Sequence, residues 1–297
     1  MIAGSFYVPK SKPNKPLGED SHFIDQEAQV IGVADGVGGF ASRGIDSGKY
    51  ARELMGNAAE IVKQRRFVNP NQLLQEAFLK SRLPGACTAC IMAIEGNLLK
   101  ATNLGDSGFA VIREGAVVYK SPAQQTKFNR PHQMERKKGG PELAEDLEVA
   151  VKAGDVIVAG TDGLFDNLFP EEIAAMVEIS LEQNNQPEVL AQILATAALQ
   201  KSLDRSCRSP FGVAAQAAGL IHSGGKYDDI TVVAAYLHAV STGKGHEVGS
   251  SEEMLTELII IDQIPPSCID SNTNPLGIFQ FDAEVFFQTD IQIVSLL

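Results

Sequence analysis

The chain has 297 residues, with 25 lysine and arginine residues against 37 aspartate and glutamate residues, so its formal net charge is −12. A hydrophobic fraction of 44% and a charged fraction of 21% are typical of a folded globular chain rather than a disordered one. Nucleic-acid binders and proteins that adhere to anionic lipid need a basic face. We therefore expect neither nucleic acid nor a membrane among its partners.

No apolar run in the sequence approaches the ~20 residues that a membrane-spanning helix needs, and no targeting segment is visible at the first residues. Four cysteines in this length favour a reducing compartment over a disulfide scaffold. Cys87 and Cys90 form a CxxC, but no second pair follows. We predict that both are small residues on a buried strand rather than a metal or redox site.

The first part of the chain is predicted to be extended and then rich in strands. Residues 1–18 contain several lysines and prolines and predict an N-terminal arm. Tight turns then separate short apolar runs, which predicts antiparallel pairing and, over 87–121, a meander. The predicted strands are 28–35, 87–94, 98–105, 109–114, 116–121, two within 147–163 around a turn at 152–155, and 228–237.

Helices are predicted between these strand groups, either from apolar residues at helical spacing or from a proline at the first helical position. They are 47–64, a helix that begins at Asn69-Pro70, 170–181 and 187–203. Because strands and helices do not alternate strictly, the fold class predicted is α+β, with antiparallel sheets covered by helices.

The last part, 240–297, is predicted to be an acidic C-terminal extension. It contains nine acidic residues and one lysine, so most of the net charge of the chain lies there. Residues 241–253 have the composition of a linker, and strict apolar–polar alternation from Phe279 to Ile293 predicts a strand with one buried face. We expect this strand to pair at a sheet edge or to dock a partner, because it has no residues suited to catalysis.

Five short acidic motifs lie at predicted strand ends or turns. They are GED (18–20), ADGVGG (34–39), GDSG (105–108), GTDGLFDN (160–167) and YDDIT (227–231). Carboxylates that gather at one place repel one another unless a cation lies between them. Oxygen ligands without cysteine suit Mg²⁺ or Mn²⁺ rather than zinc.

One segment, 36–41, also fits the glycine pattern of a dinucleotide-binding loop. A pyrophosphate there would meet the carboxylate of Asp35, and the next helix is predicted to begin only near Ser47. Both features argue against a dinucleotide site.

The order of the motifs resembles the metal-dependent Ser/Thr phosphatases of the protein phosphatase 2C type, and within them the branch found in plant plastids and mitochondria. The motifs are GEDSHFI, GVADGVGGF, CTACI, NLGDSGF, GTDGLFDNL, SPFGVAAQAAG and GGKYDDITVV. The resemblance covers about residues 4–237. It implies two antiparallel sheets between layers of antiparallel helices, a catalytic domain at 19–239 and hydrolysis of phosphoserine or phosphothreonine in a phosphoprotein substrate. It also implies a soluble intracellular monomer, in a plastid or a mitochondrion.

The resemblance further implies a binuclear Mg²⁺ or Mn²⁺ centre, whose shared hydroxide attacks phosphorus. Asp35 corresponds to the ligand that bridges the two ions, and the carbonyl of Gly36 to a ligand of one of them. Asp162 and Asp228 correspond to the protein ligands of the other ion, and Asp229 takes a place that asparagine usually occupies.

Four more acidic residues have counterparts in the family. Glu19 and Asp20 correspond to carboxylates that orient metal-bound waters. Asp106 and Asp166, together with Asp162, correspond to the ligands of a weaker third ion.

Two departures from the family pattern bear on activity. Val37 stands where many members carry a histidine that protonates the leaving group, and the phosphate-binding arginine is absent. Lys15 is near the place of that arginine, with Lys12 and Lys10 as equal candidates, but lysine cannot form a bidentate contact with phosphate. These departures support one alternative function, a pseudophosphatase that acts as a binding module.

A locally basic segment, 127–138, follows the GDSG motif. It is either a solvated loop or a flap that attracts a phosphopeptide. His132 within it is expected to be solvated, and His22 to pack beside the acidic residues.

Overall fold

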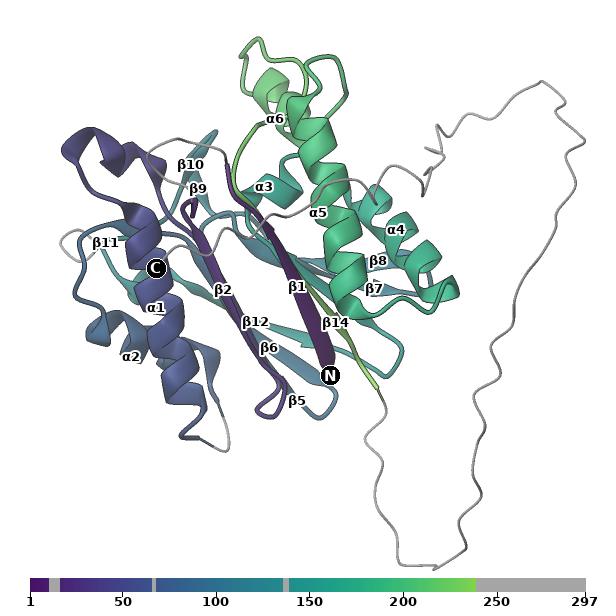
Figure 1. Ribbon diagram of the computed structural model, residues 1–297, viewed down its shortest axis with the longest axis horizontal. Coiled ribbons are helices and arrows are strands. Elements are labelled where there is room, and N and C mark those ends of the chain that lie inside the picture. Colours follow the sequence, from purple (N-terminus) through teal and green to yellow (C-terminus); the bar gives the residue numbers. More distant parts are fainter. Residues whose placement is uncertain (11–16, 66–67, 136–138, 239–297) are drawn as a thin grey trace, which may run out of the picture. The chain divides into compact units, whose positions relative to one another are not determined.

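The computed structural model describes residues 1–10, 17–65, 68–135 and 139–238 (Figure 1). All of them belong to one compact unit, Met1–Thr242, and a second unit comprises Gly243–Leu297. The linker and strand expected within 240–297 lie outside the described residues, as do Lys12 and Lys15.

Two five-stranded antiparallel sheets form the centre of the described unit. The strands of the first sheet, in spatial order, are β12 (Glu145–Ala150), β6 (Leu98–Leu104), β5 (Ala89–Glu95), β3 (Val30–Asp35) and β2 (Asp20–Asp25). Those of the second are β1 (Ile2–Val8), β14 (Ile230–Tyr236), β13 (Val156–Gly160), β7 (Gly108–Arg113) and β8 (Ala116–Lys120). The α+β class predicted from the sequence is confirmed.

Helices cover the outer face of each sheet (Figure 1). Against the first sheet lie α1 (Ser47–Val62) and α2 (Pro70–Lys80), and against the second lie α4 (Pro170–Glu182) and α5 (Pro187–Leu203). The cap predicted at Asn69 is present, because its side chain accepts a hydrogen bond from the Gln72 amide at 3.0 Å. Two further helices, neither of them predicted from the sequence, lie at the loops of the second sheet: α3 (Asp162–Phe165) and α6 (Pro210–Ala217).

The central strands are apolar on both faces because each face packs against a different layer. In β3, Val30 and Ala34 belong to the cluster beneath α1 and α2, whereas Ile31 and Val33 belong to the cluster between the sheets. The strands β5, β13 and β14 alternate in the same way. Cys87 and Cys90 are buried, free thiols in two different clusters, which confirms that this CxxC is part of the packing.

The predicted meander over 87–121 is wrong in one respect, because its strands belong to different sheets. β5 pairs with β6 in the first sheet and β7 pairs with β8 in the second. Likewise, β12 pairs with β6 and β13 with β7 and β14, so residues 147–163 are not a hairpin. The chain changes sheet at Gly105–Ser107, where Gly105 has a φ of +98°, a conformation that glycine adopts without strain.

Two more differences concern the ends of the predicted elements. Residues 2–8, expected to lie in an arm, form the edge strand β1 and pair with β14 over its whole length. The basic segment 127–138 includes short strands rather than a plain loop, namely β9 (Gln125–Lys127), β10 (Arg130–Pro131) and β11 (Met134–Glu135), the last pairing with β4 (Ala86–Cys87).

Among the described helices, none is both long and apolar enough to cross a lipid bilayer.

Candidate metal centre

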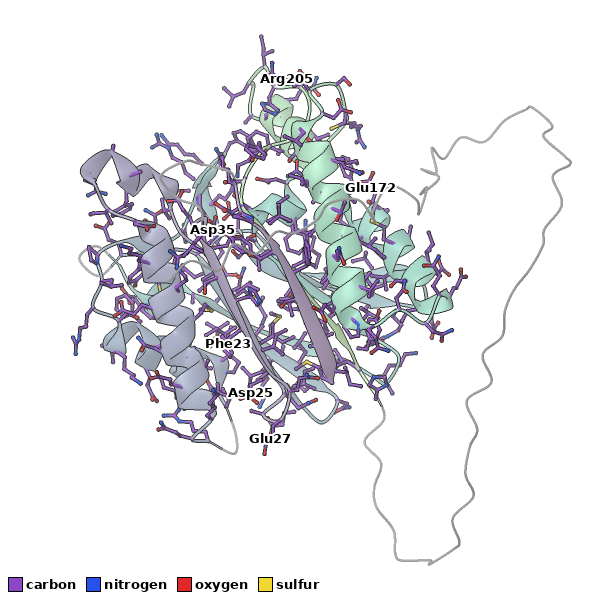
Figure 2. All side chains as sticks on the ribbon, in the orientation of Figure 1. Phe23, Asp25, Glu27, Asp35, Glu172 and Arg205 are labelled. Atoms are coloured by element: carbon purple, nitrogen blue, oxygen red, sulfur yellow. The ribbon has the colours of Figure 1, made fainter. Side chains whose placement is uncertain are left out.

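Loops at one end of both sheets bring the acidic motifs together. Asp35 ends β3, and Asp20, at the start of β2, is its partner in the antiparallel register. Asp162 follows β13 as the first residue of α3, and Asp228 precedes β14. Figure 2 shows Asp35 at one end of the β2–β3 hairpin and Asp25 at the other.

Three carboxylates meet at this end. Asp35, Asp106 and Asp162 each offer one oxygen, and these oxygens lie within 4.8 Å of one another. Burial, and next the charge of Asp162, raises the pKa of the Asp35 carboxyl well above its usual value. The same two causes raise the pKa of Asp106 to about 6. Such repulsion at short range is what a bound cation relieves.

A lysine absent from the predicted site contacts a second group of carboxylates. The Nζ atom of Lys226 lies 2.5 Å from Oδ2 of Asp162, 2.8 Å from Oδ2 of Asp166 and 3.5 Å from Oδ2 of Asp228. Burial alone would lower the pKa of this ammonium group, but the carboxylates of Asp162, Asp166 and Asp228 raise it above the usual value. The Nζ atom of Lys10 lies 3.3 Å from Oδ1 of Asp228.

Burial also raises the pKa of Asp166, to about 7, although the adjacent Lys226 acts in the opposite direction. Repulsion from Asp162 and Asp106 adds to this effect of burial on the pKa of Asp166.

Asp20 is fixed by hydroxyl groups of the second sheet. Its Oδ2 atom accepts hydrogen bonds from Thr161 at 2.7 Å and from Thr231 at 2.8 Å. Asp229, also buried, accepts hydrogen bonds through Oδ1 from the Tyr7 hydroxyl and the Lys10 amide, both at 2.8 Å. The strand β1 therefore supports the acidic end of β14.

Gly36 lies where two segments of backbone approach closely. Its amide donates to the Glu19 carbonyl at 3.1 Å, and a Cβ at this position would lie 2.5 Å from that carbonyl oxygen and 2.8 Å from the Ser47 carbonyl. Only glycine fits here without a shift of backbone. Glu19 is itself buried, and its carboxylate lies toward Gly38.

The residues present fit a divalent cation. Oδ1 of Asp20 and Oδ1 of Asp106 are buried and have no hydrogen-bond partner among the described residues. The three residues that offer these clustered oxygens are all aspartates, and carboxylate oxygens with unused lone pairs are the donors that Mg²⁺ and Mn²⁺ prefer.

The structure places most of the predicted site residues at this end of the sheets. They are Glu19, Asp20, Asp35, Gly36, Asp106, Asp162, Asp166 and Asp228. Lys15 lies outside the described residues. Sequence reasoning missed Lys226, and its only signal was a lysine two positions before Asp228 in the GGKYDDIT motif.

The two histidines discussed from the sequence, His22 and His132, have hydrogen-bond partners other than the clustered carboxylates. His22 makes a 2.8 Å contact with the Ser5 hydroxyl on β1, which agrees with a packing role. The His132 amide donates to the Gln124 carbonyl in the segment before β11. The Val37 amide donates to the Ala86 carbonyl at 2.9 Å.

Comparison with curated proteins finds relatives that are named as protein phosphatases of the 2C type. The Arabidopsis thaliana protein named Probable protein phosphatase 2C 55 is 46% identical over 243 residues, which are 80% of this chain and 52% of that protein. A second Arabidopsis thaliana protein, Probable protein phosphatase 2C 80, is 42% identical over 242 residues, which are 80% of this chain and 58% of that protein. The chain thus spans little more than half the length of these two relatives. The Oryza sativa subsp. japonica protein with the name protein phosphatase 2C 24 is 40% identical, over 80% of this chain and 76% of that protein.

Solved structures with the same fold are also found. The photosystem II phosphatase PBCP is 31% identical, with a TM-score of 0.74 over 80% of this chain and 99% of that one. The catalytic domain of the serine threonine protein phosphatase PstP, solved with two manganese ions, has a TM-score of 0.58 at 16% identity, which shows a shared fold. A comparison with models of protein families finds no match.

Proposed function

The chain belongs to the protein phosphatase 2C family, and on that basis we propose that it hydrolyses phosphoserine and phosphothreonine in proteins with the help of divalent cations. The observation that carries the proposal is the meeting of Asp35, Asp106 and Asp162 oxygens within 4.8 Å of one another. Phosphoryl transfer by two cations requires such a cluster.

Asp35, Gly36, Asp162 and Asp228 would bind two Mg²⁺ or Mn²⁺ ions in this proposal, with Asp106 and Asp166 at a third. Bound there, such ions lower the pKa of a shared water and neutralise phosphoryl oxygens. The Mn²⁺ in the PstP structure supports the choice of metal.

The residues of the chain contribute position and charge. Asp35 presents its carboxylate from the rigid end of β3, and the close approach at Gly36 fixes the carbonyl beside it. Asp20, fixed by Thr161 and Thr231, has an unused oxygen that orients water. Position 37 is a valine, which cannot protonate the leaving alkoxide. In this proposal water must deliver that proton.

The substrate in this proposal is a phosphoprotein, and the chain acts as a monomer in a plastid or mitochondrion, as in the branch it resembles. The name of PBCP, a photosystem II phosphatase, supports a plastid substrate. The alternative is a pseudophosphatase, which is favoured by Val37 and by the absence of the phosphate-binding arginine. Against it, the carboxylates needed for metal binding are all present in the sequence.

The proposal is tested by replacing Asp35. Asp35→Ala should lower the release of phosphate from a phosphothreonine peptide in Mn²⁺ by about 100-fold or more, because it removes the central carboxylate. The variant relieves repulsion in the metal-free protein, so we expect it to fold. Asp25→Asn, at the opposite end of the hairpin, is the control and should keep the wild-type rate. Undiminished turnover by Asp35→Ala would rule out this mechanism.

A further inference from the structure

Lys226 places an ammonium group among carboxylates assigned above to divalent cations. Its Nζ atom donates hydrogen bonds to Asp162 at 2.5 Å and Asp166 at 2.8 Å, and lies 3.5 Å from Asp228. Its side chain is 15% exposed. A single positive group thus contacts three carboxylates that come from two separate motifs.

The backbone of Lys226 is fixed so that its side chain reaches this position. The Lys226 amide donates to Oδ1 of Asn167, and Nδ2 of Asn167 donates back to the Lys226 carbonyl, both at 2.9 Å. Asn167 is fully buried and also donates to the Gly163 carbonyl in α3. The two residues therefore hold the loop before β14 against the helix that carries Asp162.

The ammonium group of Lys226 also lies over an aromatic ring, that of Phe211. Nζ of Lys226 lies 5.4 Å from the centre of the Phe211 ring, a distance at which a cation is attracted by the ring face. Phe211 is fixed in turn, because its amide donates to the Asp166 carbonyl at 3.0 Å. The ammonium group is thus surrounded by groups that attract a cation.

We propose that the ammonium group of Lys226 is a built-in competitor of the divalent cation. It occupies the space between Asp162, Asp166 and Asp228 while no cation is bound, and a cation binds these carboxylates only when the ammonium group leaves. The inference rests on the metal assignment made under the proposed function.

Competition has two physical consequences. The ammonium group offsets repulsion in the metal-free protein, so the folded state persists without metal. It also weakens cation binding, because its contacts with the carboxylates must be broken first and its positive charge repels the incoming ion. The metal-free and metal-bound forms therefore exchange at a higher cation concentration than the carboxylates alone would require.

The test measures Mn²⁺ affinity directly, by isothermal titration calorimetry of the full chain after chelation. Lys226→Met keeps most of the length of the side chain and removes the charge, and should lower the Kd for Mn²⁺ by about tenfold or more. Lys226→Arg keeps the positive charge, and its Kd for Mn²⁺ should be close to that of the wild type. Lys10→Met removes a charge that, among the carboxylates of the described residues, pairs with Asp228 alone, and should change the Kd by less than about threefold.

Thermal unfolding gives an independent readout. In EDTA, Lys226→Met should unfold at a lower temperature than wild type, and saturating Mn²⁺ should close most of the gap. If that variant does not fold without metal, Lys226→Gln, whose amide still donates to a carboxylate, replaces it in both measurements.

The outcomes separate the two proposals. Equal Mn²⁺ affinity of wild type and Lys226→Met would overturn the competition and leave the metal assignment intact. Absence of Mn²⁺ binding by every variant would overturn both. Binding by Lys226→Met that is tighter than that of wild type and of Lys10→Met would support both.

Discussion

Gly36 shows how a single residue sets the shape of the metal centre. A Cβ there would lie 2.5 Å from the Glu19 carbonyl and 2.8 Å from that of Ser47, so the end of β3, the loop before β2 and the start of α1 meet at this glycine. Because its own carbonyl is a proposed metal ligand, any shift of the backbone would change both packing and metal binding.

Gly36→Ala should therefore lower the free energy of unfolding by about 2 kcal/mol, since overpacking of this kind typically costs about 1–3 kcal/mol. It should also weaken Mn²⁺ binding, because the carbonyl moves with the backbone. Urea denaturation and calorimetry measure the two effects. Gly39→Ala is the matched control, because a Cβ at Gly39 would have no atom within 4 Å, and equal stability of both variants would contradict this account of Gly36.

The sequence was enough to predict which carboxylates meet, but not how Lys226 is placed. Asp35 ends β3 and Asp162 lies two residues after β13, each beside a glycine, and the ends of these apolar strands converge at one end of the packed sheets. The contact between Lys226 and Asp162 spans 64 positions in sequence and depends on side-chain torsion angles and on Asn167. Neither is encoded in a local pattern.

At the scale of elements, the metal centre exists because loops at the ends of both sheets converge. β3 and β6 of the first sheet lead into Asp35 and Asp106, and β13 of the second leads into Asp162. Burial, followed by the repulsion among the charges that these loops contribute, raises the pKa of the Asp35 carboxyl well above its usual value. Burial also raises the pKa of the Asp166 carboxyl, to about 7. Assembly of these elements is thus linked to protonation.

The sign of this linkage predicts a pH dependence for the metal-free protein. A carboxyl whose pKa is higher in the folded than in the unfolded state binds more protons when folded, so stability falls as pH rises toward the folded pKa. In EDTA, the unfolding temperature should fall between about pH 5 and pH 7, below the folded pKa of Asp166 of about 7, and less steeply in Asp166→Asn. Scanning calorimetry measures both slopes, and a wild-type stability that rises over this range, or an unchanged slope in Asp166→Asn, would contradict the prediction.

The assignment of strands to sheets could not be predicted, for a physical reason. Strands such as β5 and β13 are apolar on both faces, so alternation gives no sign of which sheet they join. Short turns suggested that neighbouring strands pair, whereas the chain changes sheet at Gly105–Ser107. β1 was missed because the lysines and prolines that follow it have the composition of a loop.

At the scale of the whole molecule, the acidity of the sequence divides into two parts. Nine acidic residues and one lysine fall within 240–297, beyond the described unit, whereas 1–239 carry 28 acidic and 24 basic residues. The part proposed to act on phosphoproteins is therefore only mildly acidic, and its central carboxylates would be neutralised by bound cations. We propose that 240–297 is an extension separate from the catalytic domain 19–239.

The most direct test of the central claim is the metal dependence of phosphate release from a phosphothreonine peptide by the 297-residue chain. After EDTA treatment and removal of the chelator, the rate should fall to background, and added Mn²⁺ or Mg²⁺ should restore it, because the cluster at Asp35, Asp106 and Asp162 needs cations to act. Full activity after chelation would contradict the proposed mechanism, and no activity at any cation concentration would favour a pseudophosphatase.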